Sequence, residues 1–359
     1  MQNWQNRSGG GDTSRVGKIQ FVHSFQDIIS IENLLEAWEE FAVGKRSKSD
    51  VQEFENRLMD NIIRLHIDLR DQIYRHGGYY AFRISDPKPR QIHKASVRDR
   101  LLHHAVHRLL YSFFDRIFIA DSFSCRIDKG THAALNRFRD LARKASRNHT
   151  HTIWVLKCDI RKFFASVDQT ILLELLFARI PNPDIRWLLA EIIGSFNSTE
   201  VGKGIPLGNL TSQLFANVYL NELDQFVKQD LRFPNYVRYA DDFVFLSPYK
   251  NELLAIPPVV SDFLQNDLNL TMHPDKIIFK TFALGIDFLG WVHFPCHRVL
   301  RKTTERRMFK RITEHPSKEA VRSYLGLLSH GDAYYLRVNI NNYSLMRVLG
   351  GQLDGFKPF

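Results

Sequence analysis

Residues 236–246 read Tyr-Val-Arg-Tyr-Ala-Asp-Asp-Phe-Val-Phe-Leu, a largely apolar stretch with two adjacent carboxylates at its centre. The alternation of side chains on either side of Ala240-Asp241-Asp242 predicts a β-hairpin with the acids at its tip. Adjacent aspartates also occur in ordinary turns. A tight hairpin turn more often carries Asn-Gly or Asp-Gly, however, and two neighbouring negative charges need a cation to offset their repulsion. The stretch therefore favours a cation-binding site.

A third carboxylate ends another apolar stretch. Residues 153–159 read Ile-Trp-Val-Leu-Lys-Cys-Asp, which predicts a buried strand ending at Asp159, with helical sequence following to about Arg179. Facing the hairpin tip, Asp159 would complete a set of three acids. Magnesium prefers oxygen ligands from a few carboxylates and substrate phosphates, and nucleotidyl transfer uses two such ions about 4 Å apart. The three acids therefore predict a nucleotidyl-transfer centre.

Composition limits the class of protein. With 359 residues and 44% hydrophobic content, the chain exceeds the size of most single cores, so we expect two or three lobes. A net charge of +10 indicates a polyanionic partner and fits a nucleic-acid enzyme, a chromatin-like binder or a membrane-surface protein. The three cysteines have no C-x-x-C spacing, which argues against a disulfide framework or zinc site and favours a reducing cytoplasm. The sequence shows no apolar stretch of about 18 residues, so we expect no membrane partner.

Strands and helices are interleaved along the chain, which predicts an α+β fold. Residues 1–18 are polar and glycine-rich and are expected to be a flexible leader. Apolar residues at helical spacing predict two helices, over residues 31–41 and 54–69, within an N-terminal helical extension at 19–75. Later segments predict strands from Tyr79 towards Arg90, a helix at 97–114, strands at 277–281 and 288–294, and helical sequence after the basic segment 298–311.

Several motifs resemble those of reverse transcriptases. Tyr239-Ala240-Asp241-Asp242 resembles their Tyr-x-Asp-Asp box, and Asp159-Ile160-Arg161-Lys162-Phe163-Phe164 resembles their first aspartate, followed five residues later by an aromatic. Residues 122–132, 268–276 and 288–291 are similar to three further blocks of the family. The resemblance covers nearly the whole chain after Lys18, in the family's order.

The resemblance implies a right-hand polymerase. It places the fingers at 76–152, the palm with its antiparallel sheet at 153–296, an interleaved fingers segment at about 171–235, and a helical thumb at 297–359. The implied activity is RNA-directed DNA polymerisation with two Mg²⁺ ions. Its implied partners are template RNA, cDNA or primer, and deoxynucleoside triphosphates.

The same resemblance implies roles for individual residues. The implied catalytic residues are Asp159, Asp241, Asp242 and Lys276, with Lys276 as the general acid for pyrophosphate, and the implied metal site is Asp159, Ile160, Asp241 and Asp242. The implied nucleotide-binding residues are Lys88, Arg90, Arg98, Phe164, Leu207, Gly208 and Gln213, of which Phe164 would exclude a ribose 2′-hydroxyl. The implied primer grip is Phe288, Leu289, Gly290 and Trp291, and the implied contacts to nucleic-acid backbone are Arg301, Lys302, Arg306, Arg307, Lys310 and Arg311.

Each role has a simpler alternative. An aromatic residue such as Phe164 or Phe163 is by default a core residue, and of the two we expect Phe163 to lie in the core. Basic loops and a lysine such as Lys276 are by default solvated surface. For the basic segment 298–311, contacts to phosphates compete with a solvated helix face.

One segment indicates the type of enzyme. It reads Ile205-Pro206-Leu207-Gly208-Asn209-Leu210-Thr211-Ser212-Gln213. Most reverse transcriptases read Gln-Gly-x-x-x-Ser-Pro here, whereas this form resembles the enzymes of diversity-generating retroelements. That type implies error-prone copying of template adenines in mutagenic retrohoming, a small basic accessory protein, and a bacterial or phage-encoded protein of the cytoplasm. The alternatives are a group II intron-like or defence-associated reverse transcriptase and a catalytically silent RNA-binding scaffold, against which the intact acid set argues.

Overall fold

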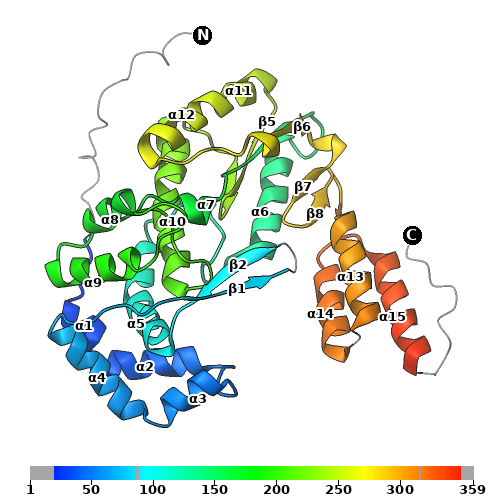
Figure 1. Ribbon diagram of the computed structural model, residues 1–359. Helices are drawn as coiled ribbons and strands as arrows, with labels where there is room; N and C mark the ends of the chain where they lie inside the picture. Colours follow the sequence, from blue (N-terminus) through cyan, green and yellow to red (C-terminus); the bar gives the residue numbers. More distant parts are fainter. Residues whose placement is uncertain (1–19, 86–88, 316, 349–359) are drawn as a thin grey trace. The chain divides into compact units, whose positions relative to one another are not determined.

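The computed structural model describes residues 20–85, 89–315 and 317–348 (Figure 1). The chain divides into two compact units. One comprises residues 1–117 and 168–218, and the other comprises residues 118–167 and 219–359. Helices and antiparallel strands occur in both units, which confirms the predicted α+β class. In the described residues, no helix is long and apolar enough to cross a bilayer.

The first unit is mainly helical. Its elements are α1 (Phe25–Ile29), α2 (Ile31–Ala42), α3 (Ser49–Glu55), α4 (Leu58–Arg70), β1 (Tyr80–Ile84), β2 (Arg90–Lys94), α5 (Val97–Phe114), α8 (Gln169–Phe177), α9 (Pro183–Gly194) and the start of α10 (Leu210–Gln225). Helix α2 buries Trp38 and packs on α5, where Asn33 donates a hydrogen bond to the Ala105 carbonyl oxygen at 3.2 Å. Strands β1 and β2 form a two-stranded antiparallel hairpin.

One prediction for this unit is wrong. The segment 54–69 is not a single helix, because α3 ends at Glu55 and α4 begins at Leu58. Arg57 lies between them with φ −129° and ψ 42°, outside the helical region. The Phe54 carbonyl oxygen accepts from the backbone N–H of Arg57 at 3.3 Å and from the side chain of Asn61 at 2.9 Å, so it stays satisfied across the break.

The second unit is built on a four-stranded antiparallel sheet. Its strand order is β4 (Tyr236–Tyr239), β5 (Asp242–Ser247), β3 (Trp154–Asp159) and β6 (Ile278–Thr281). Valines and leucines on one face of the sheet join Leu135 and Phe138 of α6 (Gly130–Ala145) in a continuous core. The remaining helices around this sheet are α7 (Phe163–Ser166), α11 (Lys250–Leu254), α12 (Ile256–Leu268) and the short η1 (Phe226–Asp230), η2 (Pro274–Lys276) and η3 (Phe282–Leu284).

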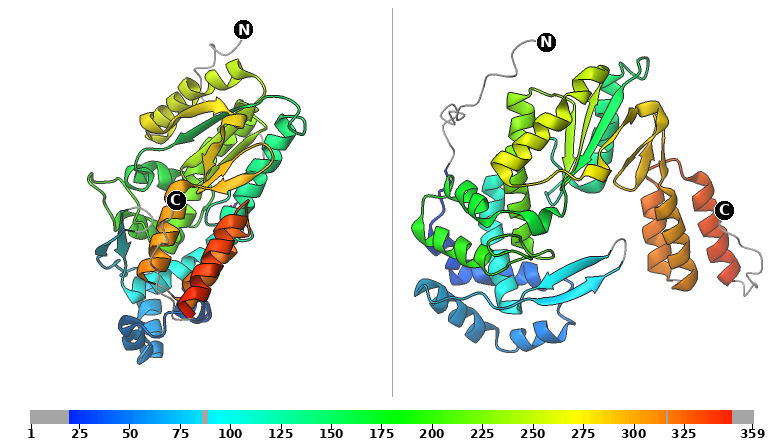
Figure 2. Two further views of the ribbon diagram at one scale, coloured as in Figure 1. Left: turned by 90° about the vertical axis from the view of Figure 1, so that its right-hand side faces the viewer. Right: turned by 45° about the horizontal axis from the view of Figure 1, so that its top comes forward.

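A second, three-stranded sheet follows in the same unit, with β7 (Ile286–Phe288), β8 (Trp291–His293) and β9 (Arg298–Leu300) in order. The helices α13 (Lys302–Glu314), α14 (Lys318–Leu328) and α15 (Tyr334–Val348) come next and pack in sequence order (Figure 2). The prediction of one strand over 288–294 is wrong. Leu289 and Gly290 have φ of 50° and 88° and turn the chain between β7 and β8, as a tight hairpin requires.

Candidate active site

Three carboxylates meet at one end of the four-stranded sheet. Strands β4 and β5 form the predicted hairpin, with Ala240 in the left-handed region at φ 53°, so this prediction is confirmed. Asp242 is the first residue of β5 and pairs with Asp159 at the end of β3. The backbone N–H of Ile160 donates to the Asp241 carbonyl oxygen at 3.2 Å, which fixes the turn against β3. Strand register therefore brings Asp159, Asp241 and Asp242 together.

Two lysines engage these acids. The Nζ atom of Lys276 lies 2.7 Å from Oδ1 of Asp159, and the Nζ atom of Lys157 lies 3.0 Å from Oδ2 of Asp242. Lys157 also donates to the carbonyl oxygen of Asp287 in β7 at 3.2 Å. Each ammonium group therefore serves as a counter-charge to one carboxylate, and Lys157 links the acid site to the three-stranded sheet.

The acids remain incompletely satisfied. Burial raises the pKa of Asp241, and the negative charges of Asp159 and Asp242 raise it further. Burial also raises the pKa of Asp242, although the charge and hydrogen bond of Lys157 act in the opposite direction. Oδ1 of Asp242 is buried and has no hydrogen-bond partner. Buried, mutually repelling carboxylates of this kind are stabilised by a cation.

The donor set fits a hard cation such as Mg²⁺, which prefers carboxylate oxygens. No group of three His, Cys, Asp or Glu side chains in the described residues is already arranged around a metal position. Lys157 and Lys276 are paired with carboxylate oxygens of Asp242 and Asp159, atoms that could otherwise bind a metal ion. The assignment of Asp159, Ile160, Asp241 and Asp242 to a metal site stays a prediction.

Arg238 supports the hairpin and is a residue that the sequence analysis missed. It is fully buried in β4, and its guanidinium group donates to both carboxylate oxygens of Asp224, from Nε at 2.7 Å and from Nη2 at 2.5 Å. Its Nη1 atom donates to the Ala240 carbonyl oxygen in the turn at 3.1 Å. The hydroxyl group of Tyr236 donates to the same carboxylate at 2.9 Å. The signal in the sequence was a charged residue within an otherwise apolar strand.

Lys157 was also missed, although the sequence contains a signal for it. Residues two apart in a strand point to the same face, so Lys157 shares the face of Asp159. The apolar pattern over residues 153–159 predicts only a buried strand that ends at an acid. A single cation two residues before that acid is a candidate ion-pair partner on the same face.

We expect Lys157→Met to lower the free energy of unfolding by about 1–3 kcal/mol, because Asp242 then keeps a buried charge without its partner. Chemical denaturation measures this loss. Lys144→Met is the matched control, since Lys144 is exposed at the end of α6. Added Mg²⁺ should restore part of the stability of Lys157→Met. Equal stabilities of the two variants would contradict the role given to Lys157.

The two aromatic residues after Asp159 differ in burial, as predicted. Phe163 is 2% exposed and lies in the core, with its ring centroid 6.4 Å from that of Tyr219. Phe164 is half-buried and meets Phe163 edge-on at 5.4 Å between centroids. The role of Phe164 in excluding ribonucleotides stays a prediction.

In the first unit, the segment around Leu207 is fixed to β2. The backbone N–H of His93 donates to the Leu207 carbonyl oxygen at 3.0 Å, and Asn209 Nδ2 donates to the His93 carbonyl oxygen at 3.1 Å. Gly208 has φ +112°, and a Cβ atom there would come within 2.7 Å of Ile92 Cγ2. Only glycine meets both constraints. Gly208 and Gln213 border a cavity of about 390 Å³.

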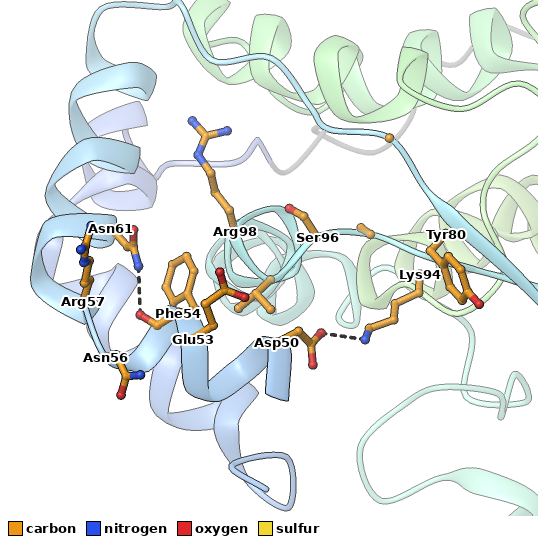
Figure 3. A pocket seen from close by; sticks show the side chains of 13 residues that line it. Asp50, Glu53, Phe54, Asn56, Arg57, Asn61, Tyr80, Lys94, Ser96 and Arg98 are labelled. Carbon is orange, nitrogen blue, oxygen red and sulfur yellow. Dashed lines mark hydrogen bonds and ion pairs between the residues drawn. The ribbon is translucent and has the colours of Figure 1, made fainter. Parts of the chain in front are cut away.

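The predicted basic residues of this unit differ in their surroundings. Arg90 is exposed at the start of β2, whereas Lys88 lies outside the described residues. Arg98 forms an ion pair with Asp68 at 2.6 Å and stacks on the Tyr74 ring. It lines a cavity of about 900 Å³ at the N-terminal helices, next to the ion pair of Lys94 and Asp50 (Figure 3). Arg98 therefore has a structural partner in α4, and its nucleotide-binding role stays a prediction.

The predicted primer grip occupies the β7–β8 hairpin. Phe288 and Trp291 are buried in the core, whereas Leu289 and Gly290 form the turn. The backbone N–H of Arg301 donates to the Gly290 carbonyl oxygen at 3.0 Å, so the turn is held by the residue between β9 and α13.

The predicted backbone contacts lie on and before α13. This helix buries Met308, Phe309 and Ile312 on one face. Its exposed cations are Lys302, Arg306, Lys310 and Arg311, while Arg307 is half-buried. Arg301 is half-buried and forms an ion pair with Asp287. The exposed cations fit contacts to phosphates, whereas Arg301 connects the start of α13 to β7.

Comparison with known proteins gives consistent matches. Residues 85–293, more than half of the chain, match the family described as reverse transcriptase (RNA-dependent DNA polymerase). Protein YkfC of Escherichia coli K12 is 24% identical over 310 residues, covering 72% of this chain and 78% of YkfC. The group II intron-encoded protein LtrA of Lactococcus lactis is 26% identical over 155 residues, and that match spans 42% of this chain and only a quarter (25%) of LtrA.

A solved structure is also similar in part. The apo telomerase of Candida tropicalis, truncated from its C-terminal domain, superposes with a TM-score of 0.48 and 12% sequence identity. The match covers 62% of this chain and 55% of the telomerase chain.

Proposed function

Because this chain belongs to the reverse transcriptase family and is an RNA-directed DNA polymerase, we propose that its chemistry takes place at Asp159, Asp241 and Asp242, with two Mg²⁺ ions as cofactors. The observation that carries this proposal is the register that pairs Asp159 with Asp242 and ties Asp241 to Ile160. When bound, the ions would activate the primer 3′-hydroxyl and hold the leaving pyrophosphate. A primer-extension assay on an RNA template, with the acid variants described in the Discussion, tests it.

The lysines would act during the same reaction. In our proposal Lys276 leaves Asp159 and gives a proton to the departing pyrophosphate, since its 46% exposed side chain is free to reorient. Lys157 would keep Asp242 oriented, because it is held at the same time by the Asp287 carbonyl oxygen. Template RNA and primer would contact the exposed cations of α13 through their phosphates, as a chain of net charge +10 favours.

Phe164 is proposed to select the sugar. We expect Phe164→Val to accept ribonucleotides about tenfold or more better than the wild type, because a smaller side chain leaves room for the 2′-hydroxyl. Single-nucleotide incorporation with matched ribo- and deoxyribonucleotides measures the ratio. Phe163→Val is the control, since it removes a core ring beside the same site and should lower stability without changing sugar selection. Unchanged sugar selection in Phe164→Val would mean that another group excludes the 2′-hydroxyl.

We further propose that the enzyme is of the diversity-generating retroelement type, copies template adenines with errors, and works with a small basic accessory protein. The supporting observation is Leu207 in the Leu-Gly-x-x-x-Ser-Gln segment, whose backbone is fixed to β2. Leucine offers an incoming nucleotide only apolar contact, whereas the glutamine usual in the family can donate a hydrogen bond. A nucleotide held less firmly loses part of the rate advantage of correct pairing.

Leu207→Gln tests the retroelement type. We expect this variant to raise fidelity several-fold, most clearly opposite template adenine, while synthesis continues. Sequencing of cDNA made by both forms on one RNA template measures the error rates. Leu207→Met, which changes shape without adding a donor, is the control and should keep the wild-type error rate. Equal adenine misincorporation by folded, active Leu207→Gln and wild type would remove Leu207 as the source of infidelity.

The second candidate is a group II intron-like reverse transcriptase, favoured by the similarity to LtrA. Faithful copying by the wild-type enzyme would support this candidate over the retroelement type.

A further inference from the structure

A cavity in the second unit shares no residue with the carboxylate site. Its volume is about 320 Å³, and it lies where the β8–β9 connection, α6 and the segment before α15 meet. Its lining residues are Arg139, His293, Phe294, Pro295, Cys296, His297, Arg298, His330, Gly331 and Asp332. Both arginines of this set come from elements already fixed in the core, α6 and β9.

Arg298 lines this cavity and has a hydrogen-bond donor without a partner. Its Nε atom donates to the His330 carbonyl oxygen and its Nη2 atom to Asn136 Oδ1 at 3.3 Å, but Nη1 is buried without a hydrogen-bond partner. In the described part of the chain, no carboxylate forms an ion pair with Arg298. Burial lowers the pKa of Arg298, and the positive charge of Arg139 lowers it further. The guanidinium group also lies over the Trp291 ring, 5.7 Å from its centroid, but this contact does not offset the repulsion by Arg139, which a bound anion would relieve.

His293 adds a neutral donor or acceptor. It is 2% exposed, its Nε2 atom has no hydrogen-bond partner, and its ring packs edge-on against Phe138 at 4.8 Å between centroids. Burial, assisted by the charges of Arg298 and Arg139, lowers the pKa of His293 to about 3, so the ring is uncharged at neutral pH. The packing fixes the ring at the wall of the cavity, with its Nε2 atom unpaired.

The one acid of the lining does not neutralise the arginines. The backbone N–H of Asp332 donates to the Arg298 carbonyl oxygen at 2.8 Å. Its side chain is exposed and forms no ion pair with Arg298 or Arg139 in the residues described. Arg139 is itself exposed and pairs with Asp140 on the outer surface of α6 at 3.1 Å. Within the lining, two arginines therefore face a single aspartate, and Nη1 of Arg298 is left without a hydrogen-bond partner.

We propose that this cavity binds a phosphate group, held by Arg298 and Arg139 with one hydrogen bond from His293. Guanidinium groups match the oxygens of phosphate in geometry and charge. Two arginines exclude a metal cation, and a volume of about 320 Å³ accommodates a phosphate together with a small attached group. The same chemistry is offered by a free mononucleotide and by the 5′-phosphate of an RNA strand. The site goes beyond the polymerase chemistry and does not depend on it.

Thermal-shift and calorimetric titrations of the full-length protein test this site, with inorganic phosphate as the first probe. Arg139→Gln removes one charged donor from an exposed position, and Arg298→Lys keeps the charge but removes the planar fork. Each should weaken phosphate binding about tenfold or more. Arg143→Gln is the matched control, because Arg143 lies one turn further along α6, outside the lining, and bonds to Asn148 at 2.8 Å. Its binding should equal that of the wild type.

Two further titrations identify the source of the phosphate. Adenosine monophosphate binding at least as tightly as inorganic phosphate, and lost in Arg139→Gln, would support a free mononucleotide. A 5′-phosphorylated RNA binding tighter than its 5′-hydroxyl counterpart in the wild type, but not in Arg139→Gln, would support an RNA end. Phosphate binding that is unchanged in folded Arg139→Gln and Arg298→Lys, or equally reduced in Arg143→Gln, would overturn the proposal.

Discussion

DNA synthesis by Asp241→Asn is expected to fall by about three orders of magnitude, while the affinity for RNA stays within twofold of the wild type. The loss follows if Asp241 is a metal ligand, since metal stabilisation of a transition state contributes several kcal/mol and each 1.36 kcal/mol is a factor of ten. RNA affinity depends on phosphate contacts by lysine and arginine, which the substitution leaves unchanged. Primer extension in Mg²⁺ and filter binding in its absence measure the two quantities.

The stability of Asp241→Asn without metal separates catalysis from folding. Burial and the neighbouring carboxylates raise the pKa of Asp241, so its ionised form is less favourable in the folded protein than in the unfolded chain. Asparagine removes that charge, and metal-free Asp241→Asn should be at least as stable as the wild type. Addition of Mg²⁺ should raise the melting temperature of the wild type and not that of the variant. Near-normal synthesis, or an equal Mg²⁺ shift in both proteins, would contradict the assignment of the acids.

Arg238→Met is expected to lower the free energy of unfolding by about 3–5 kcal/mol, the largest loss of stability among these substitutions. The reason is that Asp224 would remain fully buried with its charge unpaired. Because Arg238 also donates to the Ala240 carbonyl oxygen, the acid-bearing turn should lose its fixed position and synthesis should fall even in folded protein. Chemical denaturation, with primer extension well below the midpoint, measures both effects.

Two further variants isolate the buried pair. The double variant Arg238→Met/Asp224→Leu should recover much of the stability, since an apolar pair in the same volume leaves no unpaired charge. Arg70→Met removes an arginine from an exposed ion pair with Asp71 and should leave stability unchanged within measurement error. A double variant as unstable as Arg238→Met alone would mean that packing, and not the charge pair, holds β4.

The parts of the site that local patterns determine were predictable from the sequence. Alternation around Asp241 and Asp242 gave the hairpin, and the apolar run before Asp159 gave its strand, because both depend on residues close together in the chain. Partners distant in sequence were not predictable in the same way. Asp224 lies in α10 and pairs with Arg238 of β4 only in the folded chain. Lys157 donates a hydrogen bond to Asp287, which is 130 positions away in the sequence. The strand predicted over residues 288–294 is wrong because Leu289 and Gly290 have positive φ angles and turn the chain, which the apolar pattern does not reveal.

The two lysines at the acid site are counter-ions that the protein itself supplies. With Lys276 on Asp159 and Lys157 on Asp242, the folded chain neutralises much of its acidic cluster without any dissolved ion. Divalent ions from solution would enter by ion exchange, displacing the ammonium group of Lys276 from Asp159. Because Lys276 belongs to the same chain and stays nearby, it would form its ion pair with Asp159 again as soon as the ions leave. We therefore expect the protein to remain folded in the absence of metal.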